Sequence, residues 1–400
     1  MAKIDRPLAF ILITLMLDAI GIGIVFPIMP DLMARVGAGD LAQGSLWAGL
    51  LAAAYATAQF VFAPIVGSLS DAYGRRPVLL CALFFLALDY VVMALADTYW
   101  LLMIGRVLAG VAGATYVTAT AYVADITPRE DRAARFGLLG AAFGIGFVLG
   151  PVIGGLAGSI SVAAPFWVAA GLSAASFAFG LLILPESLKR ENRRPFGNRD
   201  LNPFAIIFEA FRIPSLVLPL ILIALFELMQ LSYATIWSFW GKETFGWSTF
   251  TVGVTLSVYG ILLALAQAVV MPFAVRFLGE ERLVSVGLIV SLVAAVGFGV
   301  AQTVWLVALL LPIAALGDLV PPTLTAIAAN VTDEDRQGML QGVIASLSSV
   351  TAVIAPIIYA PVFNAFAGED AIIWLPGAPF LLAALMILVM IALRWRVPRL

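Results

Sequence analysis

The sequence contains no histidine and a single cysteine, Cys81, among its 400 residues. Histidine is the commonest metal ligand and the usual general base, so its absence excludes Ser-His-Asp triads and most zinc sites. One cysteine alone excludes an internal disulfide framework and thiolate clusters. A membrane-embedded enzyme would need a nucleophile-base pair or a metal cluster, and the sequence offers neither. We therefore expect no catalytic residues, no metal ligands and no enzymatic activity.

Charged residues are also scarce, at 12% of the chain, and they nearly balance to a formal net charge of −2. Such a chain has no strong field to attract nucleic acid. Hydrophobic residues make up 62% and the mean hydropathy is +1.06, which is too apolar for a soluble protein. Lys3 and Arg6 precede an apolar run that extends beyond a signal-peptide core, so we expect a retained first span.

Apolar runs long enough to cross the roughly 30 Å of hydrocarbon in a bilayer occur twelve times. They begin near Leu8, Leu46, Val78, Trp100, Phe136 and Ala163, and again near Pro214, Phe250, Leu283, Val304, Met339 and Ile372. One long polar stretch separates the sixth run from the seventh. We predict an all-α integral membrane fold of twelve transmembrane helices. It has an N-terminal six-helix half (1–184), a cytoplasmic linker loop (185–212) and a C-terminal six-helix half (213–400).

Basic residues are distributed unevenly between the two sides of this arrangement. The connections that follow even-numbered spans, together with both chain ends, hold 19 of the 22 lysines and arginines. The opposite connections hold only Arg35 and Lys242, while Arg106 lies within a span. Basic residues accumulate on the cytoplasmic side, and a merely solubilising role would not divide them so unequally. We expect a multi-pass protein of the bacterial inner membrane with both termini cytoplasmic.

The two halves repeat each other at a constant offset of 205 residues. Gly74 corresponds to Gly279, and Pro151 corresponds to Pro356. Two pseudo-symmetric six-span halves are the plan of the major facilitator transporters, in which the cargo site lies between the halves near the middle of the membrane.

A charged turn joins the second span to the third and contains Asp71, Gly74, Arg75 and Arg76. Gly74 permits a tight backbone turn, and the arginines can bind carboxylates of the other half. Breaking and forming such pairs would gate an alternating-access transporter. The alternative is a topology anchor and helix cap with no gating role.

Glycines and a proline form a seam within the fifth span. Gly150, Pro151 and Gly154 are its central members, and similarly spaced glycines precede them. Small residues allow close helix approach, and proline bends a span. We expect this seam to take part in gating, and it favours export by exchange over import. A plain packing interface is the alternative.

Ionisable groups within apolar spans are costly and are functional candidates by default. Four acids and one base qualify: Asp18, Asp89, Glu227, Asp318 and Arg106. Because the chain has no histidine, any proton carrier must be a carboxylate. An acid whose distance from Arg106 changes between two states could load and release a proton, and Asp18 is the first choice. A structural hydrogen-bonded role is the alternative for each acid.

Aromatic and amide side chains in the spans suit a planar polycyclic cargo. We assign cargo binding to four of them: Gln59, Gln230, Tyr233 and Trp237. An aromatic belt at the membrane interface is the alternative, above all for Trp240.

Several of these segments resemble a known family. The turn Gly67-Ser-Leu-Ser-Asp71-Ala-Tyr-Gly74-Arg75-Arg76-Pro77 resembles the signature loop of major facilitator transporters, Gly105-Arg106 their span-four arginine motif, and Gly146 to Gly155 their antiporter motif. Five further segments resemble the tetracycline/proton antiporter family more specifically: Leu17-Asp18-Ala-Ile-Gly21, Ala58-Gln59-Phe60, Tyr122-Val-Ala-Asp125, Pro185-Glu-Ser and Ala234-Thr-Ile-Trp237. The resemblance implies that Asp18, Asp71, Arg75, Asp89 and Arg106 serve cation translocation, gating and cargo handling.

The second half departs from that family. A histidine of span eight is missing around Leu262-Leu263, and an acid of span nine is missing around Ser291. In exchange the chain has Asp318 where the family tends to have glycine, and Glu227 where it tends to have glutamine. The resemblance therefore implies a proton route that differs in this half.

These observations predict a monomeric, proton-coupled efflux antiporter for an amphipathic drug, most simply tetracycline or a related polycyclic compound. Its partners are then a small-molecule drug, protons and the lipid bilayer, and it needs no cofactor besides the proton gradient. Transport of the drug as a divalent-metal chelate is left open. Two rival classes remain, a proton-coupled symporter that imports a sugar or organic acid, and a membrane-embedded enzyme, for which the sequence offers no catalytic groups. A non-transporting receptor or scaffold is a further alternative, and it would tolerate neutralisation of all four buried acids.

Overall fold

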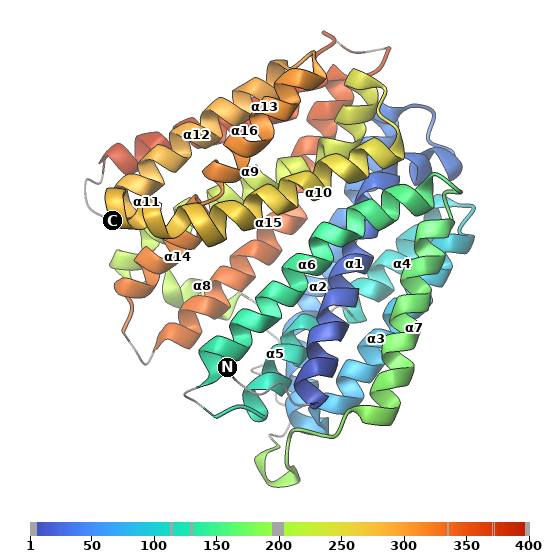
Figure 1. Cartoon of the computed structure of the whole chain (residues 1–400), viewed down its shortest axis with the longest axis vertical. Coiled ribbons are helices and arrows are strands. Elements are labelled where there is room, and N and C mark those ends of the chain that lie inside the picture. The colour runs from blue at the N-terminus through green and yellow to red at the C-terminus, as the bar shows by residue number, and fades with distance from the viewer. Residues whose placement is uncertain are drawn as a thin grey trace. The chain divides into compact units, whose positions relative to one another are not determined.

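The computed structural model describes residues 6–112, 115–128, 131–193, 204–333, 336–369, 371 and 373–396. All regular elements in those ranges are helices, as the sequence predicts (Figure 1). In the first half they are α1 (Arg6–Arg35), α2 (Leu41–Tyr73), α3 (Arg75–Leu95), α4 (Tyr99–Ala112), α5 (Thr115–Asp125), α6 (Arg132–Gly158) and α7 (Ala164–Ile183).

The second half begins with the short helix α8 (Ala205–Ala210) and continues with eight longer elements. They are α9 (Pro214–Phe245), α10 (Thr249–Leu265), α11 (Met271–Leu278), α12 (Glu280–Val300), α13 (Val304–Gly317), α14 (Val320–Asn330), α15 (Gln337–Phe366) and α16 (Ala378–Arg396). A π-helical segment, Ala266–Val270, joins α10 to α11. A 3₁₀ turn, Arg190–Asn192, follows α7.

Eleven helical segments of the described chain are long and apolar enough to cross a membrane, and Tyr99–Val111 is a shorter apolar helix. Together they match the twelve predicted spans. The last one starts later than predicted, at Ala378. Pro376 explains the shift, because a proline disfavours helical geometry in the residue before it. Ile372, the predicted start, lies outside the described residues.

The helix bounds repeat at the offset of 205 found in the sequence. The helices α3, α4 and α5 correspond end to end to α12, α13 and α14. Gly74 and Gly279, which precede α3 and α12, both have positive φ angles, 114° and 72°. An added side chain would be strained at both positions, so a glycine with the same positive-φ, extended-ψ backbone precedes the third span of each half.

Contacts divide the chain into two compact units. Unit 1 contains Met1–Gly37, Ala54–Pro203 and Thr249–Ser257, and unit 2 contains Ala38–Ala53, Phe204–Ser248 and Val258–Leu400. The helices α2 and α10 each contribute residues to both units. The predicted boundaries at residues 184 and 212 stay a prediction, and residues 194–203 of the predicted linker lie outside the described residues.

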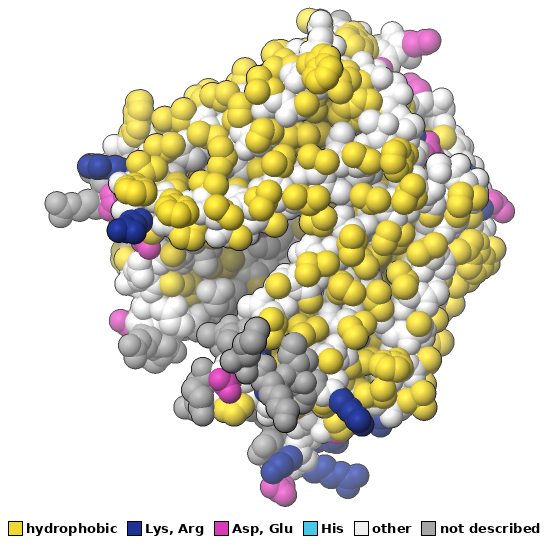
Figure 2. Space-filling model, in the orientation of Figure 1, with side chains coloured by type: hydrophobic (Ala, Val, Ile, Leu, Met, Phe, Trp, Pro, Cys, Tyr) yellow, Lys and Arg dark blue, Asp and Glu magenta, His cyan; other side chains and the backbone are white. Residues whose placement is uncertain are grey.

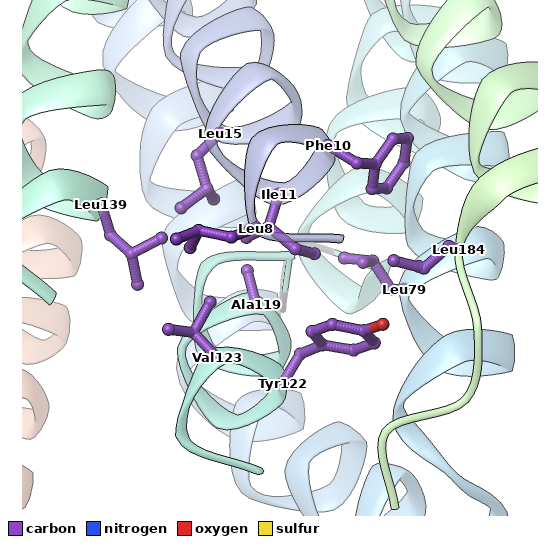
Figure 3. Packing of buried hydrophobic residues seen from close by; sticks show 10 residues of the cluster. All are labelled: Leu8, Phe10, Ile11, Leu15, Leu79, Ala119, Tyr122, Val123, Leu139 and Leu184. Carbon is purple, nitrogen blue, oxygen red and sulfur yellow. The ribbon is translucent and has the colours of Figure 1, made fainter. Parts of the chain in front are cut away.

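A buried apolar cluster holds the start of α1 in unit 1 (Figure 3). Its members come from α1, α3, α5, α6 and the end of the α7 segment: Leu8, Phe10, Ile11, Leu15, Leu79, Ala119, Tyr122, Val123, Leu139 and Leu184. The Tyr122 hydroxyl donates a 2.9 Å hydrogen bond to the Pro185 carbonyl, so its one polar atom is satisfied. This packing fixes the helix that carries Asp18 one turn further on.

The faces that the helices turn outward are apolar. In Figure 2 yellow side chains cover the visible helices, and the charged side chains lie near helix ends. Large exposed apolar residues on α6 and α12 include Ile145, Leu149, Ile289 and Val293. Helices that expose such residues along their length are suited to contact lipid rather than water.

Candidate functional site

A buried ion pair in unit 1 joins Asp89 of α3 to Arg106 of α4. The side chains are 1% and 13% exposed. A Cβ on Gly105 would lie 2.9 Å from Asp89 Oδ1, so the glycine admits the carboxylate against α4. The Tyr55 ring centre lies 5.4 Å from the Arg106 guanidinium, which is within cation–π range. The arginine is thus held between a carboxylate and an aromatic face.

Asp18 of α1 is half-buried beside this pair. It interacts electrostatically with Tyr55 and with Tyr90, which follows Asp89 on α3. The Tyr90 hydroxyl lies against Gly21, one turn after Asp18, where a larger residue would collide with it. Tyr55 interacts with both Asp18 and Arg106, so it links the predicted residue Asp18 to the Asp89–Arg106 pair. We call Asp18, Tyr55, Asp89, Tyr90 and Arg106 the unit 1 centre.

The two tyrosines of this centre were missed by sequence reasoning. A tyrosine in an apolar span carries no charge penalty that would single it out, since its ring packs like that of phenylalanine. The position of Tyr90 directly after the predicted acid Asp89 is the one available signal.

The glycine seam of α6 packs against α1, the helix that carries Asp18. Three glycines at intervals of four residues face three carbonyl groups at the same interval: Gly146, Gly150 and Gly154 face Met16, Ile20 and Ile24. A Cβ on Gly150 would lie 2.7 Å from the Ile20 oxygen. Pro151 lies opposite Gly23, where a Cβ would approach its ring to 2.9 Å. The seam is thus a close backbone contact, which is how small residues join helices in membranes.

The charged turn between α2 and α3 forms a network around Arg75. Its guanidinium pairs with Asp71 and with Asp125 at the end of α5, at 3.3 Å from the latter, and it donates a 2.6 Å hydrogen bond to Ser70 Oγ. The Ser187 hydroxyl donates to Asp125 as well. The sequence predicts carboxylate partners in the other half, but these described partners all belong to unit 1.

Glu186, which follows α7, caps the start of α3. Its carboxylate accepts hydrogen bonds from the backbone amides of Arg75 (2.9 Å) and Arg76 (3.3 Å). Arg76 in turn donates a 2.8 Å hydrogen bond to the Leu181 carbonyl near the end of α7. A Cβ on Gly74 would collide with the Glu186 carboxylate, so this glycine is needed for space as well as for its φ angle. Sequence reasoning did not assign Glu186 a role.

Asp318 is the centre of a second polar cluster, in unit 2. It is 6% exposed and lies between α13 and α14. The Gln230 amide of α9 donates a 2.9 Å hydrogen bond to Asp318 Oδ2, and the Tyr259 hydroxyl of α10 donates to the same oxygen. The structure thus joins the predicted residues Asp318 and Gln230. It adds Tyr259, for which the sequence gives no signal. We call these three residues the unit 2 cluster.

Of the other predicted residues of unit 2, Tyr233 interacts electrostatically with Asp318. Glu227 of α9 is half-buried, with the hydroxyls of Ser348 and Thr351 on α15 in hydrogen-bonding range. Tyr233 stacks on Phe380 with ring centres 5.2 Å apart.

Trp237 is only 4% exposed and belongs to an aromatic cluster of unit 2. Its ring contacts Trp240, Phe298 and Trp247 at centre distances of 5.1, 5.3 and 6.0 Å. In unit 1, Gln59 of α2 is half-buried, and its backbone amide lies against Gly110 of α4. The cargo-binding roles of these residues stay predictions.

Comparison with known proteins identifies the fold and the family. The family model of the Major Facilitator Superfamily matches residues 11–240 and 228–399. The chain is 39% identical over 388 residues to the tetracycline resistance protein, class C, of Escherichia coli, which covers 96% of both chains. It is 37% identical over 390 residues to the class E protein of Escherichia coli, covering 96% of this chain and 95% of that one.

Among solved structures, the human organic anion transporter MFSD10 (TETRAN) has the same fold. Its TM-score is 0.72 at 23% identity, over 98% of this chain and 100% of that one. These matches confirm the predicted fold class. The matched proteins are transporters, in agreement with the expectation that the protein is not an enzyme. The chain belongs to the major facilitator superfamily, and its relatives over nearly its whole length are tetracycline resistance proteins.

Proposed function

We propose that this protein exports tetracycline, or a related polycyclic drug, from the bacterial cell in exchange for protons. The observation that carries the cargo assignment is the similarity to tetracycline resistance proteins along 96% of the chain. The buried acids in the spans support the coupling to protons, because ionisable groups at that depth are rare outside ion and substrate pathways.

Asp18 is the coupling residue of this proposal, and Tyr55, which interacts with both Asp18 and Arg106, links it to the Asp89–Arg106 pair. The Asp89–Arg106 pair is almost wholly buried, so water screens it little. A change in its geometry would alter its interaction with Tyr55, which in turn interacts with Asp18. Protonation of Asp18 on the outward side would release cargo, and deprotonation on the inward side would restore the empty binding state. Glu227 and Asp318 are the further candidate carriers in unit 2.

The network of Asp71, Arg75 and Asp125 is the proposed cytoplasmic gate, and Gly74 and Arg76 shape its turn. Charge-assisted hydrogen bonds of this kind are among the stronger polar contacts, yet those near the surface can exchange with water. The seam at Gly150, Pro151 and Gly154 is the second proposed gating contact, because its glycines bring the backbones of α6 and α1 close together beside Asp18.

We place the protein in the inner membrane with both termini and the linker in the cytoplasm, on the basis of the charge distribution in its connections. Gln59, Gln230, Tyr233 and Trp237 are the proposed cargo contacts. The chain works as a monomer with no resident cofactor, and a divalent ion enters only as part of a drug chelate. Because Trp237 is buried in its cluster, cargo contact there requires the cluster to open.

Accumulation of tetracycline in energised cells tests this proposal. Cells that express the chain should hold several-fold less drug than control cells, and a protonophore should abolish the difference. Asp18→Asn should raise accumulation to the control level. Asp97→Asn is the matched control and should leave export intact, because the side chain of this acid is 84% exposed and its pair with Arg35 lies at the surface, where such pairs contribute little. Equal accumulation with and without the chain would overturn the cargo assignment.

A further inference from the structure

The tenth span is broken at Asp318. The helix α13 ends at Gly317, and α14 begins at Val320. Asp318 and Leu319 lie between them in a turn, with ψ angles of 12° and −13°. The segment is nevertheless buried, since Leu319 and Val320 are 2% and 0% exposed. Broken spans with irregular backbone at membrane depth are the places where transporters hold coupling ions.

Two prolines prevent the helix from satisfying its own carbonyl groups at this break. In a continuous helix the carbonyls of residues 317 and 318 would accept from the amides of residues 321 and 322. Those residues are Pro321 and Pro322, which have no N–H. The carbonyl oxygens of Gly317 and Asp318 therefore lack their helical donors, beside a carboxylate.

A buried hydroxyl faces the same break from α12. Ser291 is 5% exposed, and its Oγ has no hydrogen-bond partner within the described part of the chain. It lies directly against Gly317, since a Cβ there would collide with it. A buried hydroxyl without a hydrogen-bond partner costs free energy of folding, and a bound ligand would remove that cost.

We propose that this break is a binding site for a monovalent metal cation of sodium type. The ligands are the Asp318 carboxylate, the freed carbonyls of Gly317 and Asp318, and Ser291 Oγ, with Gln230 and Tyr259 holding the carboxylate in place. Hard oxygen donors suit alkali and alkaline-earth ions. A single carboxylate balances one positive charge, and a neutral site is what the low dielectric of the span requires.

The helix dipoles agree with this assignment. The C-terminal end of α13 carries partial negative charge and favours a cation, while the N-terminal end of α14 favours the Asp318 carboxylate. The site goes beyond the proposed drug export, since that proposal needs no metal ion held by the protein. A cation bound here would be a second coupling ion for the exporter. It would bind at Asp318, which the sequence analysis names as a candidate proton carrier.

Binding of ²²Na⁺ to the purified full-length chain tests the proposal, with choline chloride holding the ionic strength constant. We expect saturable binding of about one ion per chain. Asp318→Asn should weaken it by about tenfold or more, and Ser291→Ala by roughly threefold to tenfold. Pro321→Ala with Pro322→Ala should also weaken it, because the new N–H groups would occupy the two carbonyls. Asp97→Asn and Ser349→Ala are the matched controls and should bind as the parent does.

Two results would overturn the site: no saturable sodium binding by the parent chain, or undiminished binding by Asp318→Asn. If Asp318→Asn fails to fold, undiminished sodium binding by Ser291→Ala and by the double proline variant would overturn the site instead. The assay contains no drug and no proton gradient. If the chain did not export drug in cells, a measured binding of sodium would still support the cation site. If the chain did not bind sodium, the proposal of drug export would be unaffected.

Discussion

Glu186 accepts a hydrogen bond from the backbone amide of Arg75, at 2.9 Å and across 111 residues of sequence. Arg76 makes the reverse contact to Leu181, so the end of α7 and the start of α3 cap each other. This reciprocal cap places Arg75 for its pairs with Asp71 and Asp125. The proposed gate therefore depends on a residue outside the charged turn itself.

Glu186→Ala should remove the cap and destabilise the protein by about 1 kcal/mol, as the loss of an N-cap acceptor does. It should also lower the rate of drug export, because Arg75 loses its fixed backbone. Thermal unfolding and export by vesicles measure the two effects. Glu191→Ala, an exposed acid five residues further on, is the control and should change neither.

Arg75→Ala should reduce export by about tenfold or more while leaving drug affinity within about twofold, because it removes charged hydrogen bonds of the gate only. Equilibrium binding of tetracycline to the purified variant separates the two quantities. If affinity fell as far as the export rate, Arg75 would have a structural or cargo-binding role instead.

Gly150→Ala should disturb the contact between α6 and α1, since the new methyl group would lie 2.7 Å from the Ile20 oxygen. We expect a loss of about 1–3 kcal/mol of stability, typical of overpacking, and slower export because Asp18 lies on α1. Gly144→Ala is the matched control, because nothing lies within 4 Å of its added Cβ. Equal effects of the two substitutions on unfolding and export would contradict the account of the seam.

Asp89→Asn should destabilise the protein by about 3–5 kcal/mol, because it leaves Arg106 buried without its counter-charge. Replacing both residues, as Asp89→Leu with Arg106→Met, should recover most of that stability while abolishing export. Chemical unfolding in detergent measures the stability of each variant. A double variant no more stable than Asp89→Asn would show that the pair is not coupled in this way.

The sequence predicts the fold well because long apolar runs and basic connections recur along the chain, and because the offset of 205 residues relates its two halves. Asp18, Asp89 and Arg106 could be selected as candidates from the sequence, since charged groups in apolar spans stand out, but the pairing of Asp89 with Arg106 could be seen only in the fold. The Glu186 cap was not, because an acid in a polar segment carries no periodic signal and its partner is 111 residues away. Tyr259 was missed because only the folded chain brings its hydroxyl to Asp318.

The most direct test of the account is proton movement in everted membrane vesicles that contain the protein. A gradient is established by respiration, with the vesicle interior acidic, and tetracycline is then added. We predict that tetracycline dissipates the gradient through the parent chain, as protons leave in exchange for drug, and that Asp18→Asn shows no response. A gradient unchanged by tetracycline in parent vesicles, at matched protein content, would contradict drug/proton exchange by this protein.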